Sequence, residues 1–454
     1  MDRLAIVNGT VLTMNPQREV LPGGTVLLEG GRITATLPAA APLPAGWPLH
    51  DASGCAVLPG LVNAHTHLYA SLGRSLSFGE DLLQWLTTQK NLIAQFDDDD
   101  FLTCIEVGLA LNLKSGNTCV VDAMALPADS DARYRAALDL AQRYRLQYVL
   151  ARAYTSQMVG PEYVEPLPAL ERSLRALLDS HHRAADGRLQ IELSPNLPWG
   201  LSIEGFRLTR RLADEYGARI HMHTAESADY PVMIEKAFGH RSNIRVYADG
   251  GCLGPDVQLL GCATLTDEEF AVVARTGTRV ILDPVSGTTL GTGEAPVLQV
   301  MANGHPTALA TNGLASAGAQ DLFDAMKTLI STARTRGGGV RAMSAQRALE
   351  MATIEGARAL GLDGEIGSLE PGKRGDVVCV DLNHLFCGPT FDVAATLVFA
   401  ASSRDVRDVL LGGAFAVRDR RLLLADEAAL TARATQRAAA ALARARAQAR
   451  NGRP

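Results

Sequence analysis

The sequence predicts an α/β protein, namely a (β/α)8 TIM barrel joined to a small β-sandwich domain that both chain ends form. In the middle of the chain, eight short apolar or β-branched runs alternate with segments of helical spacing. Repeated βα units imply parallel strands, and eight of them imply a closed barrel. Strand-like runs punctuated by turn residues flank this alternation on both sides, and a chain of 454 residues is long enough for a second, smaller domain.

The flanking β segments come first and last along the chain. The N-terminal part reads LAIVNGTVLTM and GGTVLLEGGRITAT, and the C-terminal part reads IGSLEPGKRGDVVCVDL and VRDVLLGGAFAVRDRRLLL. Short apolar runs separated by glycine and other turn residues are typical of strands. We therefore expect a composite β-sandwich domain from residues 1–56 and 361–425, the barrel from 57–360, and an Ala- and Arg-rich C-terminal helix from 426–454.

The eight predicted barrel strands are separated by segments with the periodicity of amphipathic helices. Several of these segments, such as FRLTRRLADEYG, end at a glycine, which helix C-termini favour. The predicted strands occupy residues 57–63, 118–122, 147–153, 189–194, 218–223, 256–261, 278–283 and 306–311.

Composition limits the classes of partner. The chain carries 49 acidic and 43 basic residues, a net charge of −6, so no broad surface for nucleic acid or an anionic membrane is expected. No apolar run approaches the ~20 residues of a membrane helix, and the N-terminus does not read as a signal peptide. The seven scattered cysteines form no CxxC and suit reduced thiols. We expect a soluble, cytoplasmic protein.

Two histidines end the first predicted barrel strand, in VLPGLVNAHTHLYA. Residues i and i+2 of a strand point to the same face, so His65 and His67 are expected to project inward together. That end of a (β/α)8 barrel is where active sites are built. A single histidine there is more often a core residue, whereas a pair at strand spacing favours a metal site.

A second cluster ends the fifth predicted strand, in IHMHTAES. His221 and His223 share a face, and Glu226 follows His223 by three residues. Glu226 also has a structural interpretation, since an acid is favourable in the first turn of a helix. Imidazole nitrogens suit zinc or iron, and a carboxylate just outside the coordination shell can move protons to and from water. Together with the first pair, this cluster favours metal-dependent chemistry.

These motifs resemble those of a known family. PGLVNAHTHLYASLGRSL, HTAES, LTDEE, LGTGEAPV and GSLEPGKRGDVVCVDL are similar to the metal-dependent amidohydrolase superfamily, in particular its branch of cytosolic deaminases and chlorohydrolases acting on purines, pterins, triazines and related heterocycles. The resemblance runs from about residue 3 to residue 427. It implies that His65, His67 and His223 are metal ligands, and that Glu226 shuttles protons to the ring nitrogen and the leaving group.

Four positions depart from the pattern of this branch. The aspartate that usually ends strand 8 is replaced by Asn312 in ALATNGLAS. The strand 6 histidine is replaced by Gly261 in LLGCATLTDEE, and the histidine expected after strand 4 is replaced by Asn196 in SPNLPW. After strand 7 the chain reads LDPVSG, with Asp283, where a histidine-containing turn is expected.

These replacements change the predicted chemistry. Asn312 can offer an oxygen to a metal but cannot act as a base, and loss of a positioned base commonly costs ~10²–10⁴ in rate. Three neutral histidines can still hold a zinc ion that activates water. Asp283 is a candidate substitute for the missing acid, with a turn role as its alternative. The resemblance places Trp85 at the substrate entrance, where core packing is an equal alternative, and Asn196 is a candidate substrate contact.

Two functions are therefore open. The first is a hydrolase that cleaves a C–N bond of a small nitrogen heterocycle or amide with a metal-activated water, in a deamination-like reaction with Asn312 in place of the usual aspartate. The second is a catalytically inactive or repurposed relative that binds a ligand or partner. The retained Glu226 and histidines favour the first. We expect one Zn²⁺ or Fe²⁺ per chain, a small-molecule substrate, and, from the resemblance, a homo-oligomer.

Overall fold

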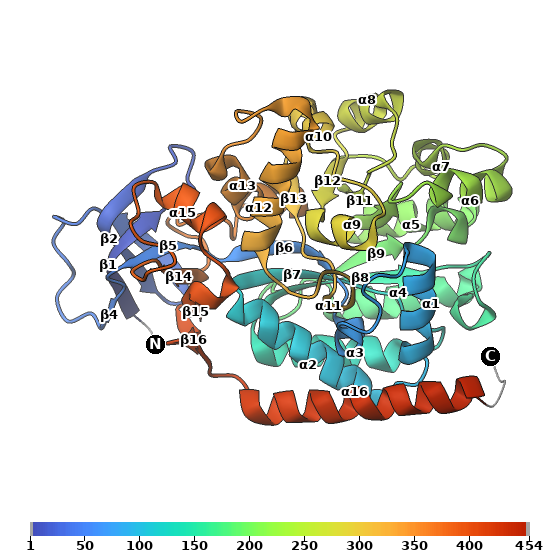
Figure 1. The fold of residues 1–454 in the computed structure, drawn as a ribbon, viewed down its shortest axis with the longest axis horizontal. Coiled ribbons are helices and arrows are strands. Elements are labelled where there is room, and N and C mark those ends of the chain that lie inside the picture. The colour runs from blue at the N-terminus through green and yellow to red at the C-terminus, as the bar shows by residue number, and fades with distance from the viewer. Residues whose placement is uncertain (1–2, 451–454) are drawn as a thin grey trace.

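The structure is a computed structural model that describes residues 3–450. Its strands form two separate sheets (Figure 1). Within these residues, one sheet holds eight strands that pair in parallel and in sequence order from β6 to β13. The backbone N–H of Asn312, just after β13, donates to the carbonyl of His65 in β6 (3.1 Å) and brings the last strand back to the first. This confirms the predicted (β/α)8 barrel. Its strands are β6 (Leu61–Thr66), β7 (Asn117–Met124), β8 (Gln147–Tyr154), β9 (Leu189–Pro195), β10 (Ile220–Thr224), β11 (Val257–Gly261), β12 (Arg279–Leu282) and β13 (Thr307–Leu309).

A separate mixed sheet contains strands from both ends of the chain (Figure 1). Its order is β17-β16-β15-β14-β5-β1-β2-β3, with β4 beside β1, so the antiparallel pair of β5 and β14 joins the two parts. The small β domain predicted from both chain ends is thereby confirmed, whereas the predicted residue limits of the domains stay a prediction. The strands are β1 (Arg3–Leu12), β2 (Val20–Glu29), β3 (Arg32–Leu37), β4 (Leu49–Asp51), β5 (Cys55–Pro59), β14 (Val377–Asp381), β15 (Val406–Leu411), β16 (Ala414–Arg418) and β17 (Arg421–Leu422).

The apolar run 57–63 was predicted to form one barrel strand, but it belongs to two strands. It divides at Gly60, because β5 ends before this residue in the mixed sheet and β6 begins after it in the barrel. The N–H of Gly60 donates to the carbonyl of Asp376 (2.9 Å), and a Cβ at this position would lie 1.9 Å from Oγ1 of Thr118. The chain therefore crosses from one sheet to the other at a point where only glycine fits.

Helices surround the barrel (Figure 1), and α5 shows why these segments are helical. The hydroxyl of Ser202 accepts from the N–H of Gly205 (3.2 Å) at its start, Phe206 and Leu212 are buried, and Gly217 adopts a φ of +62° at its end.

No helix within residues 3–450 is both long and apolar enough to cross a bilayer. The α-helices are α1 (Leu82–Ile93), α2 (Asp98–Lys114), α3 (Asp131–Tyr144), α4 (Leu167–His181), α5 (Ile203–Tyr216), α6 (Asp229–Phe238), α7 (Asn243–Asp249), α8 (Asp267–Thr276), α9 (Pro284–Leu290), α10 (Val297–Asn303), α11 (Leu314–Ala317), α12 (Leu322–Ala333), α13 (Ala345–Met351), α14 (Ile354–Leu360), α15 (Val393–Phe399) and α16 (Glu427–Arg450). Shorter turns of 3-10 or π type are η1 (Leu68–Gly73), η2 (Pro161–Tyr163), η3 (Pro198–Gly200), η4 (Arg334–Gly338) and η5 (Ser403–Asp405).

The C-terminal helix α16 lies along the outside of the barrel beside α2 (Figure 1). Its Arg437 pairs with Asp97 (3.0 Å) and with Asp99 (2.6 Å), and Arg444 pairs with Asp100. Asp97 and Asp100 also form a capping box at the start of α2. The run of four aspartates therefore stabilises the N-terminus of α2 and also holds α16 against it.

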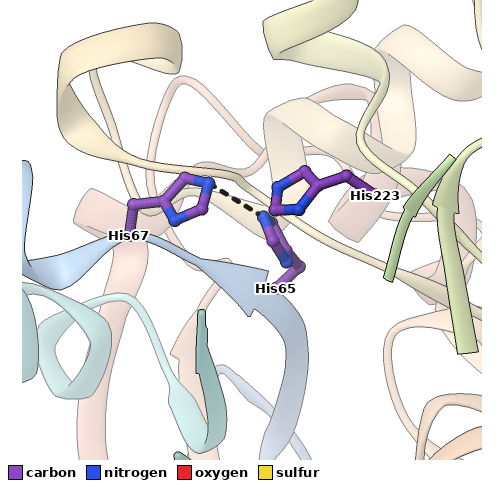
Figure 2. Close-up of side chains that lie close together, drawn as sticks. All are labelled: His65, His67 and His223. Carbon is purple, nitrogen blue, oxygen red and sulfur yellow. Dashed lines mark hydrogen bonds between the residues drawn. The ribbon is translucent and has the colours of Figure 1, made fainter. Parts of the chain in front are cut away.

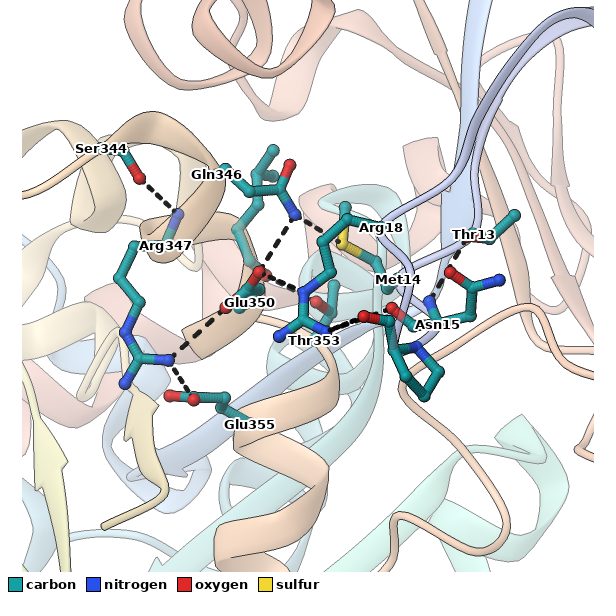
Figure 3. Close-up of polar contacts among 12 residues, drawn as sticks. Thr13, Met14, Asn15, Arg18, Ser344, Gln346, Arg347, Glu350, Thr353 and Glu355 are labelled. Atoms are coloured by element: carbon teal, nitrogen blue, oxygen red, sulfur yellow. Dashed lines mark hydrogen bonds and ion pairs between the residues drawn. The ribbon is translucent and has the colours of Figure 1, made fainter. Parts of the chain in front are cut away.

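A polar joint connects the β domain to the barrel helix α13 (Figure 3). Arg18, in the loop between β1 and β2, donates from Nε to Oε1 of Glu350 (2.7 Å) and from Nη1 to the carbonyl of Pro16 (2.8 Å). Nε2 of Gln346 donates to the same Oε1 (3.2 Å). Burial opposes ionisation of Glu350, but the hydrogen bonds from Arg18 and Gln346 and the charge of Arg18 outweigh it and lower the pKa. The joint is thus an ion pair with one buried partner.

We expect Glu350→Gln to lower the free energy of unfolding at pH 7 by about 1–3 kcal/mol, because Arg18 loses a charged partner. Since folded Glu350 has a lowered pKa, this stabilisation is present above the unfolded pKa near 4.5 and is lost as pH falls through the folded value. Urea unfolding at pH 7 and below about pH 4 measures the difference. Glu171→Gln, which weakens a partly exposed pair with Arg175, is the control and should cost at most ~0.5 kcal/mol. A difference from wild type that persists undiminished at low pH contradicts this assignment.

Candidate metal centre and active site

The histidines implied as metal ligands meet at the carboxyl end of the barrel strands (Figure 2). His65 lies in β6, His67 directly follows this strand, and His223 lies in β10. One ligand nitrogen from each lies within 4.8 Å of the others. The rings of His67 and His223 are nearly parallel (7°) with centroids 5.4 Å apart, and the ring of His65 stands almost perpendicular to both, at 86° and 85°. The fold thus brings together the three histidines that the resemblance implies as metal ligands.

Ring nitrogens of these histidines face one another. Nδ1 of His67 lies 2.6 Å from the carbonyl oxygen of Ala123, to which it donates, so Nε2 carries the lone pair. This Nε2 lies 3.2 Å from Nε2 of His65. His223 is hydrogen-bonded to the backbone of Asn196, and its Nδ1 is buried without a hydrogen-bond partner in the described part of the chain. A cation that accepts several nitrogen lone pairs fits this arrangement.

Burial keeps these imidazoles neutral. It lowers the pKa of His67 to about 4 and lowers the pKa values of His65 and His223 well below their usual range, where the neighbouring imidazoles add to the effect. Neutral imidazole is the form that binds zinc or iron. The chemistry of the donor set therefore fits a divalent metal ion.

Glu226 lies in the loop between β10 and α6 and is buried in the cavity that His67 and His223 line. Its Oε2 accepts a hydrogen bond from the hydroxyl of Tyr230 (2.5 Å). Burial, together with the charge of Asp283, raises the pKa of Glu226 to about 8. The carboxyl group is therefore largely protonated at neutral pH and can donate a proton.

Gly261, which stands where the resemblance expects a histidine, gives Glu226 its space. Its φ is +90°, a conformation that favours glycine. A Cβ at this position would lie 2.7 Å from Cγ of Glu226 and 3.3 Å from the carbonyl oxygen of Thr224. A histidine here would displace Glu226, so the departure at this position is a packing requirement of the observed site.

Asn312, at the place of the usual strand 8 aspartate, is hydrogen-bonded to a neighbouring acid. Its Nδ2 donates to Oδ2 of Asp283 (2.8 Å) and to Oγ of Ser286 (3.0 Å). Its Oδ1 accepts from the N–H of Gly313 (2.7 Å) and from Oγ of Ser316 (3.0 Å). The opposite amide orientation would turn an oxygen towards a carboxylate, so the network assigns the donor to the Asp283 side. Asn312 therefore holds Asp283 in place.

A cavity of about 450 Å³ opens over the histidines. Of the residues singled out from the sequence, His65 lies outside its lining, and His67, His223, Glu226, Asp283, Asn312, Asn196 and Trp85 line it. Nε1 of Trp85 in α1 donates to the carbonyl of Ala315 (3.0 Å), which holds the indole at the wall. This volume suits a small molecule. Much of the remaining wall is apolar and includes Leu82, Leu83, Leu86, Ile93, Leu197, Trp199, Met233 and Leu290.

Several contacts in the site were not predicted from the sequence. Tyr230 follows Glu226 by four residues, the spacing of one helical turn, and this spacing was a usable signal. His221, which was predicted to share a face with His223, contacts Nδ1 of His65 through its Nε2 (2.8 Å) and is not part of the ligand group. The bond between Asn312 and Asp283 depends on neighbouring strands and has no local signal.

Comparisons with known proteins identify the family. Residues 56–415 match the amidohydrolase family. The chain is 33% identical over 425 residues to 5-methylthioadenosine/S-adenosylhomocysteine deaminase of Symbiobacterium thermophilum, covering 92% of this chain and 94% of that protein. It is 31% identical over 435 residues to 5′-deoxyadenosine deaminase of Methanosarcina mazei, covering 94% and 95%.

Solved structures show the same likeness. An adenosine deaminase from Xanthomonas campestris with bound zinc superposes with a TM-score of 0.88 at 26% identity, covering 97% of this chain and 98% of that one. Atrazine chlorohydrolase from Arthrobacter aurescens TC1 complexed with zinc superposes with a TM-score of 0.89 at 24% identity, covering 96% and 100%. The second likeness shows the fold alone.

The barrel, the histidine cluster and these relatives together define the class: a hydrolase that acts on carbon–nitrogen bonds other than peptide bonds. The chain belongs to the amidohydrolase family. The resemblance to the deaminase and chlorohydrolase branch, seen first in the sequence motifs, is confirmed. Family membership and the zinc-bound relative support a divalent metal in this site.

We expect Gly261→Ala to lower the free energy of unfolding by about 2–4 kcal/mol, because the added Cβ combines backbone strain with a contact on Glu226. Gly239→Ala is the matched control: Gly239 has a similar φ of +72° with nothing within 4 Å of an added Cβ, and this change should cost ~1 kcal/mol. Chemical denaturation of the two variants measures both values. Equal costs would show that position 261 has room for a side chain.

Proposed function

We propose that this protein is a metal-dependent deaminase that hydrolyses the exocyclic C–N bond of an adenosine carrying an apolar 5′ group. One observation carries the proposal: three buried histidines converge, two of them, His67 and His223, line one cavity with Glu226, and burial raises the pKa of Glu226 to about 8. The relatives at 33% and 31% identity are deaminases named for 5-methylthioadenosine, S-adenosylhomocysteine and 5′-deoxyadenosine. These molecules share an adenine amine and differ at the 5′ position.

His65, His67 and His223 would hold one Zn²⁺ or Fe²⁺ per chain. When bound, such an ion supplies the Lewis acidity that activates water at neutral pH. The neutral state of the imidazoles and the unpaired Nδ1 of His223 support this assignment. Two ring positions are held by protein acceptors, namely Nδ1 of His67 by the carbonyl of Ala123 and the ring of His223 by the backbone of Asn196.

Glu226 acts as the acid in this proposal. Its carboxyl group donates a proton to the ring nitrogen as the oxygen of water adds to the adjacent carbon. The same carboxylate then takes up and passes on a second proton, so that the amine leaves as ammonia and the ring keeps a carbonyl. A pKa of about 8 suits this role, because the group holds its proton at neutral pH and accepts it back readily.

Asp283 acts as the base that receives a proton from the attacking water. Its carboxylate lines the cavity, and Oδ2 accepts from Oγ of Ser286 (2.5 Å) and from Nδ2 of Asn312 (2.8 Å). Burial raises its pKa, which increases its basicity. In this arrangement Asn312 positions Asp283, which takes the role of the aspartate that usually ends strand 8.

The cavity wall favours an uncharged 5′ group. Among the described lining residues, Lys90 is the single Lys or Arg side chain, and it pairs with Glu162 (2.6 Å). A phosphorylated nucleotide would therefore find no free cation, whereas a methylthio or deoxy group would contact the apolar wall. Trp85 and Asn196 are the proposed substrate contacts, the indole as a surface for the nucleoside and the amide as a hydrogen-bond partner.

A second function, ligand binding without turnover, is favoured by one observation. The amide oxygen of Asn312 is engaged by Gly313 and Ser316, so strand 8 adds no charge to the histidine cluster. A neutral site of this kind binds metal more weakly than one with a carboxylate. Turnover measurements separate the two functions.

The decisive experiment combines zinc analysis of the purified protein with ammonia release from adenosine, 5′-deoxyadenosine and 5′-methylthioadenosine. We expect about one zinc per chain and faster turnover of the apolar substrates. Glu226→Gln should lower kcat by about 10²–10⁴-fold without loss of zinc. Glu235→Gln, the same change on the exposed surface of α6, should leave kcat unchanged. Zinc-loaded protein that releases no ammonia from any of them would favour the second function.

We expect Asn312→Asp to tighten zinc binding only modestly, because the new carboxylate would face Asp283 where an amide now donates at 2.8 Å. The double variant N312D/D283N restores a donor opposite the new acid and should bind zinc about tenfold more tightly than N312D alone. Competition with a chromophoric chelator gives each Kd. If neither variant binds zinc more tightly than wild type, position 312 is not beside the metal.

A further inference from the structure

Three buried polar side chains lie in a row behind His65, on the side away from the other ligand histidines. Nδ1 of His65 is 2.8 Å from Nε2 of His221, and Nδ1 of His221 is 2.9 Å from Oε1 of Gln258. Nε2 of Gln258 donates to Oε1 of Glu192 (2.9 Å), and Oε2 of Glu192 lies 3.6 Å from Nδ1 of His221. These residues are at most 2% exposed. The row is a continuous hydrogen-bonded chain from a carboxylate to a proposed metal ligand.

Neighbouring barrel strands create this row. Glu192 lies in β9, His221 in β10 and Gln258 in β11, and His221 and Gln258 are direct partners in the parallel register of their strands. Side chains of adjacent parallel strands that point to the same face lie beside one another. The chain has a cost in buried polar groups that a core of leucine and valine would avoid.

The hydrogen bond between Gln258 and Glu192 assigns the protons along the chain. Nε2 of Gln258 donates to Oε1 of Glu192, so the amide presents its Oε1 to His221. Oε1 is an acceptor, which places the proton of His221 on Nδ1. In an imidazole with one proton, Nε2 of His221 is then an acceptor, and the proton between the two rings belongs to Nδ1 of His65. Nε2 of His65 is left with its lone pair directed at the cluster.

We propose that Glu192, Gln258 and His221 are positioning residues that hold the proton of His65 on Nδ1 and thereby keep its Nε2 free to bind the metal ion. The inference rests on the metal site of the proposed function. His67 reaches the same state by a shorter route, through the carbonyl of Ala123. Nδ1 of His65 instead faces Nε2 of His221, and the polar chain takes the place of a backbone acceptor. Partners of this kind behind a ligand orient the ring and raise its affinity for metal.

Gln258→Leu tests the assignment by removing the acceptor opposite His221. We expect its zinc Kd, measured by chelator competition, to rise about 10–100-fold. Glu192→Gln keeps an oxygen acceptor for Gln258 and should weaken binding less than Gln258→Leu. Gln147→Leu is the matched control, since Gln147 is a buried glutamine in β8 that donates to the carbonyl of Gly187 (3.0 Å). This control should bind zinc as wild type does.

A second measurement addresses the protons directly and does not depend on activity. Two-bond ¹H–¹⁵N spectra of the metal-free wild-type protein, labelled at histidine, distinguish the Nδ1–H from the Nε2–H form of each ring. We expect Nδ1–H for His65 in wild type and a mixture of forms in Gln258→Leu. A wild-type His65 that carries its proton on Nε2 overturns the inference, as does a Gln258→Leu variant whose zinc Kd stays within twofold of wild type. Wild-type protein that binds no zinc overturns the proposed metal site itself.

Discussion

Imidazole nitrogens that face one another in a buried space are the constraint on which the rest of this molecule depends. Two imidazole nitrogens of His65 and His67 stand 3.2 Å apart, and Nδ1 of His223 is buried without a partner in the described chain. A buried nitrogen left unpaired costs about 1–3 kcal/mol, and two nitrogens that both kept their lone pairs would repel each other. A bound cation would remove both penalties. In its absence β6, β10 and the polar groups behind the rings have to hold the arrangement, which explains why so much buried polarity surrounds it.

The distribution of acids around the barrel follows from this constraint. Strand 8 ends with the amide of Asn312, and the neighbouring carboxylate of Asp283 is held by that amide. Gly261 leaves the space that Glu226 occupies. In the proposed mechanism, the proton-accepting and proton-donating groups are both retained, but the ligand set is neutral. In this mechanism the site would bind the metal ion more weakly, and the carboxylate of Asp283 would act on the substrate without being a metal ligand.

Hydrophobic periodicity predicted the barrel well, because a strand buried on both faces reads as a short apolar run whatever its partners are. The fifth run, 218–223, lies within two residues of β10, Ile220–Thr224. Strand spacing likewise predicted that His65 and His67 project to the same side, and their Nε2 atoms lie 3.2 Å apart. Other features depend on residues far apart in the chain: the break at Gly60 requires Asp376, and the partner of His221 requires the register of β10 against β11. One sequence contains no record of such pairings, so local patterns could not reveal them.

The packing of the last helix links the end of the chain to the mouth of the cavity. Ala441 of α16 is fully buried against Leu92 of α1 and Phe96, and α1 also carries Trp85 at the cavity wall. The helix α16 therefore packs against the outer side of α1, which carries Trp85 at the cavity wall. Arg437 and Arg444 of α16 also pair with Asp97, Asp99 and Asp100. Because high salt weakens exposed ion pairs, it would loosen the contact of α16 with α1 before it disturbed the barrel core.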